Sequence, residues 1–323
     1  MDKNTKKIDA KLIGNIAPYI GLVAVIIIFT ALTKGALLSV TNLQTMSNSV
    51  IVTALATIGA VFVFGAGYFD MSLSGCICFA AVIGGYAAIG TGNIFVAAIV
   101  ILLVALAFGL VKGIFAATVN VPFFIFTIVL GSVISAVVLV IMGSESTIYL
   151  SDAVKEIPTL SFSQMSVVNI IFLAAFFIIC LVLFNFTSIG VRVKNMGGNI
   201  ISAKQSGIDT RKTTIVAFLI SSVGVAIAAF VILLRTRTVG GTTASSVGND
   251  VMVALVLGGM PLSGGPKSKI SAGLLGAATI TVLNSGLTIM GLTTGQIQIC
   301  RGIVFIVVVL ISSLSYRGKL LPR

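Results

Sequence analysis

Few side chains in this sequence could carry chemistry, and Asp70 is the most informative of them. It lies in the stretch GAGYFDMSLSG, between two apolar runs. A carboxylate at membrane depth is costly unless it is paired, hydrated or at a boundary. Asp70 is therefore either a proton or cation site of an ion-coupled carrier or a cap on the helix that begins at Met71, and the cap is the favoured interpretation. Ser72 would support a polar turn in either case.

A second set of polar residues lies in the last third of the chain. Asn249 and Asp250 follow Gly248 at the start of a short apolar run, where Asp250 is expected to act as an N-cap. Asn284 lies deep in a later run, where it would either bond a neighbouring helix or face a solute path. Arg301 lies in the final run and should reach outward to the interface or pair with an acid.

The sequence argues against an enzyme. The chain has no His and only eight acidic residues, and no pairing of a nucleophile with a base is visible. The segment Leu262–Gly265 reads LSGG, which is also the signature tetrapeptide of ATP-binding cassette ATPases, but the chain lacks the G-x-x-x-x-G-K-[ST] loop of such enzymes. We expect a tight turn there, with glycines in positive φ, and we expect neither a cofactor nor a bound metal.

The composition predicts the elements that must position these residues. Hydrophobic residues make up 58% of the chain, charged residues 9%, and the mean hydropathy is +1.20. A soluble domain needs more polar surface, so we expect an all-α, polytopic membrane protein with one transmembrane domain over residues 1–323. Ten spans of suitable length are predicted: 15–33, 48–66, 72–90, 94–116, 122–142, 166–186, 213–234, 249–260, 270–290 and 297–315.

Two of these spans have unusual starts. The eighth is short and is followed by GGMPLSGG, which favours a broken segment packed on protein or lining a cavity. The fifth follows Asn120, Val121 and Pro122, and it opens with Phe123. That ring could stack on a sugar, although packing in the core or against lipid is the more ordinary use.

Basic residues predict the orientation. Ten spans put both termini on one side, which then holds fifteen of the twenty Lys and Arg residues: Lys3, Lys6, Lys7, Lys11, Lys112, Arg192, Lys194, Lys204, Arg211, Lys212, Lys267, Lys269, Arg317, Lys319 and Arg323. The opposite side holds Lys34, Lys155, Arg235 and Arg237. This split predicts cytoplasmic termini in a cell membrane. It leaves a large external loop at 143–165, which carries Glu145, Asp152 and Glu156, and predicts a short surface helix within 35–47.

The largest internal loop, residues 190–212, is polar and basic. It is longer than a connection between two helices requires, so we expect a soluble protein to bind it.

Several motifs together resemble the permease subunits of ribose-type, carbohydrate-class ATP-binding cassette importers, over most of the chain. They are Gly67–Gly75 (GYFDMSLSG), Val121–Ile128 (VPFFIFTI), Thr187–Val191 (TSIGV), Met196–Ile208 (MGGNIISAKQSGI), Gly258–Gly265 (GGMPLSGG) and Leu283–Leu287 (LNSGL). The region before the eighth span, Arg237–Gly241 and Gly248–Ala254, departs from the family pattern, and the solute is not defined by the motifs.

The resemblance implies a function and a set of partners. It implies a fold like that of type II importers, and a short coupling helix over 199–207 that docks on a cytoplasmic ATPase, with Asn199 as its cap and Gly207 as its stop. The implied coupling residues are Gly197, Gly198, Asn199, Ala203, Ser206, Gly207 and Ile208. The expected partners are that ATPase, an external binding protein, a second permease chain and membrane lipid, with no nucleic acid. Candidates for the solute path are Asp70, Ser72, Phe123, Asn249, Asp250 and Asn284, and an ion-coupled secondary transporter using Asp70 is the alternative.

Overall fold

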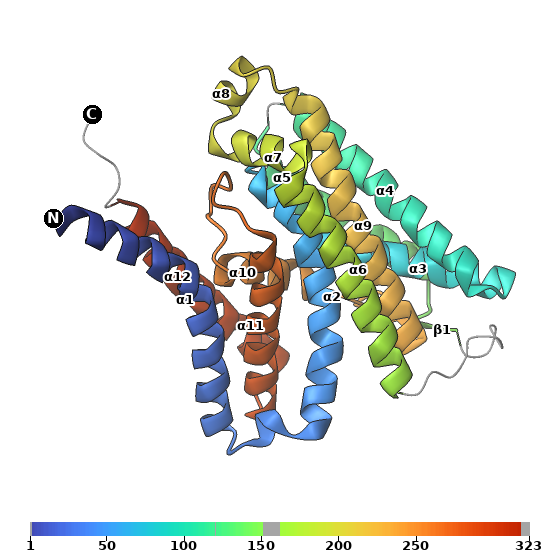
Figure 1. Ribbon diagram of the computed structural model, residues 1–323. Helices are drawn as coiled ribbons and strands as arrows, with labels where there is room; N and C mark the ends of the chain where they lie inside the picture. The colour runs from blue at the N-terminus through green and yellow to red at the C-terminus, as the bar shows by residue number, and fades with distance from the viewer. Residues whose placement is uncertain (1, 120, 151–161, 318–323) are drawn as a thin grey trace.

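The computed structural model is almost entirely helical (Figure 1). It describes the backbone of residues 2–119, 121–150 and 162–317, and side chains within 16–310 apart from residues 120 and 151–163. The elements in order are α1 (Asp2–Leu32), η1 (Ala36–Leu38), α2 (Val40–Gly65), α3 (Leu73–Thr91), α4 (Ile94–Thr118), α5 (Phe123–Met142), β1 (Thr147–Tyr149), α6 (Phe162–Phe186), α7 (Ser188–Gly198), α8 (Ile200–Gln205), α9 (Thr210–Thr236), β2 (Thr238–Gly240), α10 (Val247–Leu257), α11 (Ile270–Ile289) and α12 (Thr294–Arg317).

Within the described ranges, seven helices are long and apolar enough to cross a membrane. They are α2, α3, α4, α5, α6, α9 and α11. Three further apolar segments are shorter: Ile16–Leu32 of α1, Val247–Leu257 of α10 and Thr294–Leu310 of α12. Each of these ten helices overlaps one of the ten predicted spans, and the prediction of an all-α polytopic membrane protein is confirmed. The short eighth span is α10, which has only 11 residues.

Short polar side chains set where several helices begin. Ser39 accepts the backbone N–H of Asn42 at the start of α2, and Asn93 accepts that of Phe95 at the start of α4. Asp209 does the same for Lys212 at the start of α9. These residues satisfy backbone donors that the first turn of a helix leaves without partners.

Helix α2 is the central element of the bundle. All of its residues from Ile51 to Gly65 are buried, and it packs against α9 on one side and α11 on the other (Figure 1). Close approach depends on small residues: a side chain at Gly109 of α4 would collide with Ser222 of α9, and one at Gly224 of α9 would meet Leu55 of α2. Such contacts replace the hydrophobic driving force that lipid does not supply between helices.

The structure differs from the sequence expectations in two places. No separate helix occupies 35–47: Ala36–Leu38 forms one 3₁₀ turn, and α2 already begins at Val40 because Ser39 caps it. The second difference is a two-stranded antiparallel sheet, in which Ile148 of β1 pairs with Val239 of β2. It ties the start of the loop at 143–165 to the end of α9. Glu145 in that loop is exposed, whereas Asp152 and Glu156 lie outside the described residues.

Candidate solute cavity and coupling helix

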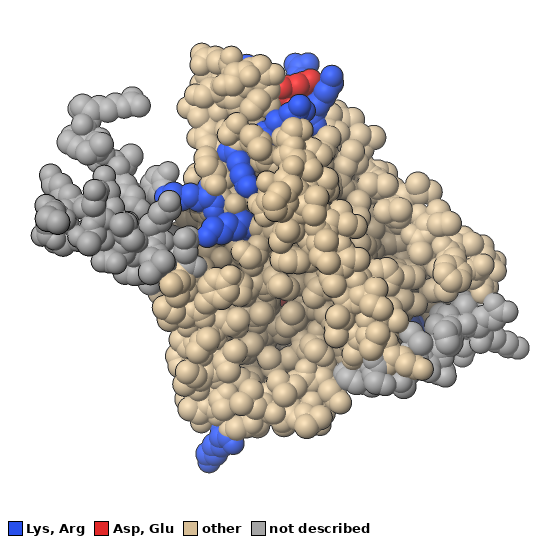
Figure 2. All heavy atoms as spheres, in the orientation of Figure 1, with Lys and Arg blue, Asp and Glu red and all other residues tan. Residues whose placement is uncertain are grey.

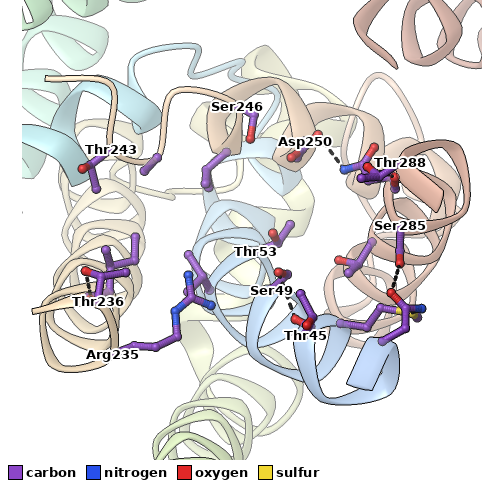
Figure 3. Close-up of a pocket in the computed structure, with 18 of the residues that line it drawn as sticks. Thr45, Ser49, Thr53, Arg235, Thr236, Thr243, Ser246, Asp250, Ser285 and Thr288 are labelled. Atoms are coloured by element: carbon purple, nitrogen blue, oxygen red, sulfur yellow. Dashed lines mark hydrogen bonds between the residues drawn. The ribbon is translucent and has the colours of Figure 1, made fainter. Parts of the chain in front are cut away.

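A polar cavity of about 500 Å³ lies between α2, α9, α10 and α11 (Figure 3). Its lining residues are Asn42, Thr45, Met46, Ser49, Val52 and Thr53 from α2, Ile232, Arg235 and Thr236 from α9, Thr243, Ala244, Ser246, Val247 and Asp250 from α10 and the segment before it, and Thr281, Asn284, Ser285, Thr288 and Ile289 from α11. Most of these side chains carry a hydroxyl, an amide or a charge, which is unusual inside a bundle of apolar helices.

Five of the hydroxyl groups that line the cavity share one arrangement. Those of Thr45, Ser49 and Thr281 each donate to the carbonyl oxygen four residues earlier in the same helix, over 2.8 to 3.1 Å. Thr236 and Thr288 make the same bond. A hydroxyl that donates to its own helix keeps its oxygen lone pairs free. These groups therefore present acceptors to whatever occupies the cavity.

Asp250 lies one turn inside α10, so the expectation that it would act as the N-cap was wrong. Ser246 occupies the cap position, and Asp250 pairs with Arg301 of α12, with 2.8 Å between Oδ1 and Nη1. The expected pairing of Arg301 with an acid is confirmed. The burial of Asp250 makes the ion pair more favourable than a cap, because an unpaired charge at that depth would be costly.

Asn284 joins the same cluster from α11. Its Oδ1 accepts a hydrogen bond from Arg301 Nε over 2.6 Å, and its Nδ2 lies 3.5 Å from Asp250 Oδ1. The three side chains fasten α10, α11 and α12 together. The interpretation that Asn284 bonds a neighbouring helix is confirmed. Asp250 and Asn284 also line the cavity, and their place on a solute path stays a prediction.

Asp70 lies elsewhere in the protein and is buried, with 4% of its surface exposed. Its Oδ2 is 2.6 Å from Nζ of Lys112 in α4, which is 2% exposed. Its Oδ1 accepts from the backbone N–H and the hydroxyl of Ser72. Helix α3 begins at Leu73 with Ser72 at the cap position, so Asp70 orders the turn before the helix but is not its N-cap.

The position of Lys112 corrects the assignment of fifteen basic residues to the cytoplasmic side. Lys112 was assigned to the cytoplasmic surface, but it is buried inside the bundle against Asp70. The sequence prediction missed this pair because 42 residues separate its members. A lysine inside an apolar run was the available signal, since a buried cation needs a counter-charge.

The remaining path candidates do not reach the cavity. Ser72 is fully buried beside Asp70, and Asn249 is exposed. Phe123 packs with Tyr68 and Phe218 in a separate apolar cluster, as the packing interpretation predicted. Among the six candidates, the cavity brings together only Asp250 and Asn284. The sequence prediction missed Thr45, Ser49 and Thr53, although their spacing of four residues puts three hydroxyls on one helix face.

The predicted helix within 199–207 is present as α8. Asn199 caps it by accepting the N–H groups of Ile201 and Ser202. The helix ends at Gln205, before Ser206, and Gly207 then adopts a φ of +79°. The N–H of Ile208 donates to Ala203, which is buried. The helix therefore has the cap and the stop that the sequence predicted.

Glycines hold the end of α7, directly before α8, against the rest of the protein. The turn at Leu262–Gly265 has Gly264 and Gly265 at φ of +67° and +91°, as predicted, and the N–H of Gly265 donates to Gly65 of α2. A side chain at Gly197 would collide with the backbone of Gly65, and one at Gly198 would meet Pro266. The residues directly before α8 therefore pack closely against the end of α2 and the turn at 262–266.

Blue side chains in Figure 2 gather at the end of the molecule that carries α7 and α8 in Figure 1, with one at the opposite end. The polar segment 190–212 thus forms part of a basic surface.

The geometry defines a class of protein: a helical membrane bundle with an internal polar cavity and one protruding polar helix. The chain matches the family described as "Branched-chain amino acid transport system / permease component" over residues 42–312, and it belongs to that family. It is a multi-pass membrane permease, and it carries the features of the ribose-type subunits of ATP-binding cassette transporters.

Individual relatives cover most of the chain at low identity. The chain is 27% identical to the xylose transport system permease protein XylH of Haemophilus influenzae, over 93% of this chain and 96% of that protein. It is 26% identical to the ribose import permease protein RbsC of Escherichia coli, over 91% and 92%. A 32% identical match to the probable ABC transporter permease protein YphD of E. coli covers 38% of this chain and 37% of that protein. No solved structure matches the chain.

Proposed function

We propose that the chain is the membrane subunit of an ATP-driven importer of small carbohydrates. The cavity between α2, α9, α10 and α11 is the observation that carries the proposal. Its volume of about 500 Å³ suits a monosaccharide-sized solute. Its hydroxyl oxygens and amides offer the hydrogen-bond partners that a sugar needs in place of water. Two relatives that cover nearly the whole chain are named for ribose and xylose.

In this proposal, energy comes from a separate ATPase that docks on α8. Ile200 and Ile201 are exposed on that helix, at 42% and 66%, and offer apolar anchors for a partner. The proposed docking surface comprises these two residues with Gly197, Gly198, Asn199, Ser206, Gly207 and Ile208, and the buried Ala203 supports it from beneath. ATP binding would favour one access state through its different affinity for the two states.

The proposal places α8 and both termini in the cytoplasm. The start of α2 and the end of α9, which line the cavity, then lie on the outer side of the membrane. The basic surface around α8 supports this orientation. An external binding protein would deliver the solute, and a second permease chain would complete the transporter.

Uptake of labelled ribose and xylose by cells that express the chain with its genomic partners tests the proposal. Uptake should continue after addition of an uncoupler while ATP is held constant, and should stop when the partner ATPase is inactivated. Gradient-driven uptake into proteoliposomes that contain this chain alone would instead establish the ion-coupled alternative. Asp70 gives that alternative little support, because Lys112 and Ser72 already engage both of its carboxylate oxygens.

A further inference from the structure

Arg235 introduces a charge into the cavity that the rest of the lining does not balance. It belongs to the last turn of α9, and Figure 3 shows its side chain extending from α9 into the space toward α2. A cation near the carboxyl end of a helix is favoured by the carbonyl dipoles there. That effect accounts for a basic residue at this position, but it does not require the guanidinium to point into the cavity.

The charges around the cavity can be followed group by group. Two of the lining residues, Arg235 and Asp250, are charged. Asp250 is neutralised by Arg301, whose Nη1 lies 2.8 Å from its Oδ1. Across residues 16–310, apart from 120 and 151–163, Arg235 has neither an acidic partner within ion-pair distance nor a hydrogen-bond acceptor. Within the described part of the chain, the cavity wall therefore carries one positive charge without a counter-charge.

The other lining groups cannot supply the missing negative charge. The serine and threonine hydroxyls are neutral, and those of Thr45, Ser49, Thr236, Thr281 and Thr288 donate to their own helices. They would accept hydrogen bonds from the hydroxyls of a sugar, whereas the guanidinium only donates. The cavity thus has one zone of acceptors for a polyol and one cationic donor. Hydrogen bonds from guanidinium to carboxylate or phosphate are roughly twice as strong as neutral ones and can be bidentate.

We infer that the solute is a monosaccharide-sized polyol that carries an anionic group, a carboxylate or a phosphate ester, and that Arg235 selects it. This inference rests on the proposed function, because it assigns a ligand to the same cavity. The acceptor groups bind the hydroxyls of the solute, and Arg235 binds its charge. A neutral sugar fills the acceptor zone but leaves the guanidinium without a counter-charge.

Equilibrium binding to the full-length permease in lipid nanodiscs, measured by calorimetry, tests the inference. Three probes share one ring and differ at carbon 6: D-glucose, D-glucuronate and D-glucose 6-phosphate. The wild-type protein should bind at least one of the anionic probes about tenfold or more tightly than glucose. Arg235→Gln should remove this preference and leave glucose binding little changed, while Arg235→Lys should retain part of it. Lys34→Asn removes a charge from an exposed turn outside the cavity and should preserve the preference.

The probes also separate the two possible anionic groups, since glucuronate and the phosphate ester are compared directly. Equal binding of glucose and both anions, or equal losses for all three in Arg235→Gln, would overturn the anionic solute while leaving a carbohydrate cavity in place. If none of the three probes binds to the wild-type protein at millimolar concentration, the cavity is not a monosaccharide site and the inference is wrong. Docking of the ATPase on α8, measured separately, would then decide whether the transporter proposal survives.

Discussion

Lys112 Nζ lies 2.6 Å from Asp70 Oδ2, and this ion pair joins α4 to the turn before α3. The side chains of both residues are almost completely buried, at 3% and 2% exposure. Removing one partner of a buried pair leaves the other charge without compensation, which costs about 3–5 kcal/mol, whereas removing both costs less. This asymmetry gives the first prediction.

Lys112→Met and Asp70→Asn should each lower the thermal stability of the detergent-solubilised protein, and the double variant should recover part of the loss. Size-exclusion chromatography of a fluorescent fusion after heating measures the effect. Lys204→Met, at an exposed position on α8, is the matched control. If Asp70→Asn alone behaves like the wild-type protein, the pair contributes little and Asp70 serves only the turn through Ser72.

The second prediction concerns the cluster of Asp250, Asn284 and Arg301. Arg301→Met should abolish uptake and destabilise the protein, because it leaves Asp250 buried and unpaired. Asn284→Ala should lower uptake with a smaller loss of stability, since the ion pair remains. Labelled-sugar uptake and melting temperature are measured on the same preparations. Wild-type uptake by Arg301→Met would show that the cluster does not shape the cavity.

The third prediction concerns α8. Gly198→Leu, which meets Pro266, and Ala203→Glu, which puts a charge at a buried position, should leave the protein in the membrane but weaken its association with the ATPase. Co-purification of the ATPase from membranes is the measurement. Gly90→Leu is the control, because a side chain there meets no neighbour. Undiminished ATPase recovery with both variants, one directly before α8 and one within it, would exclude this helix as the dock.

The fourth prediction concerns orientation. In a Cys300→Ser background, a cysteine at Ser144 should react with an impermeant thiol reagent from outside intact cells, while one at Ser202 should react only after the membrane is opened. Both serines are exposed, and Cys76, Cys78 and Cys180 are buried, so the background labelling should be low. Reversed labelling would overturn cytoplasmic termini.

The class of fold follows from the sequence alone. Runs of about 20 apolar residues can only be helices in a bilayer, because lipid cannot satisfy an open backbone, so the ten helices were predictable. Local signals were equally reliable. Asn199 caps the start of α8 and Gly207 follows its end, as predicted. Gly264 and Gly265 take positive φ, also as predicted. Both kinds of signal are local, because a cap or a left-handed residue depends on a few neighbouring atoms.

The sequence does not show which polar residues share a site, because that depends on how the helices pack. From its sequence neighbours, Asp250 was expected to be a cap, but its partner Arg301 is 51 positions away in the sequence. Lys112 and Asp70 form an ion pair although 42 positions separate them. Such pairings depend on how helices rotate and cross, which hydropathy does not encode. The cavity has the same origin: its hydroxyls come from α2, α9, α11 and the segment before α10, and packing alone brings Arg235 to face them.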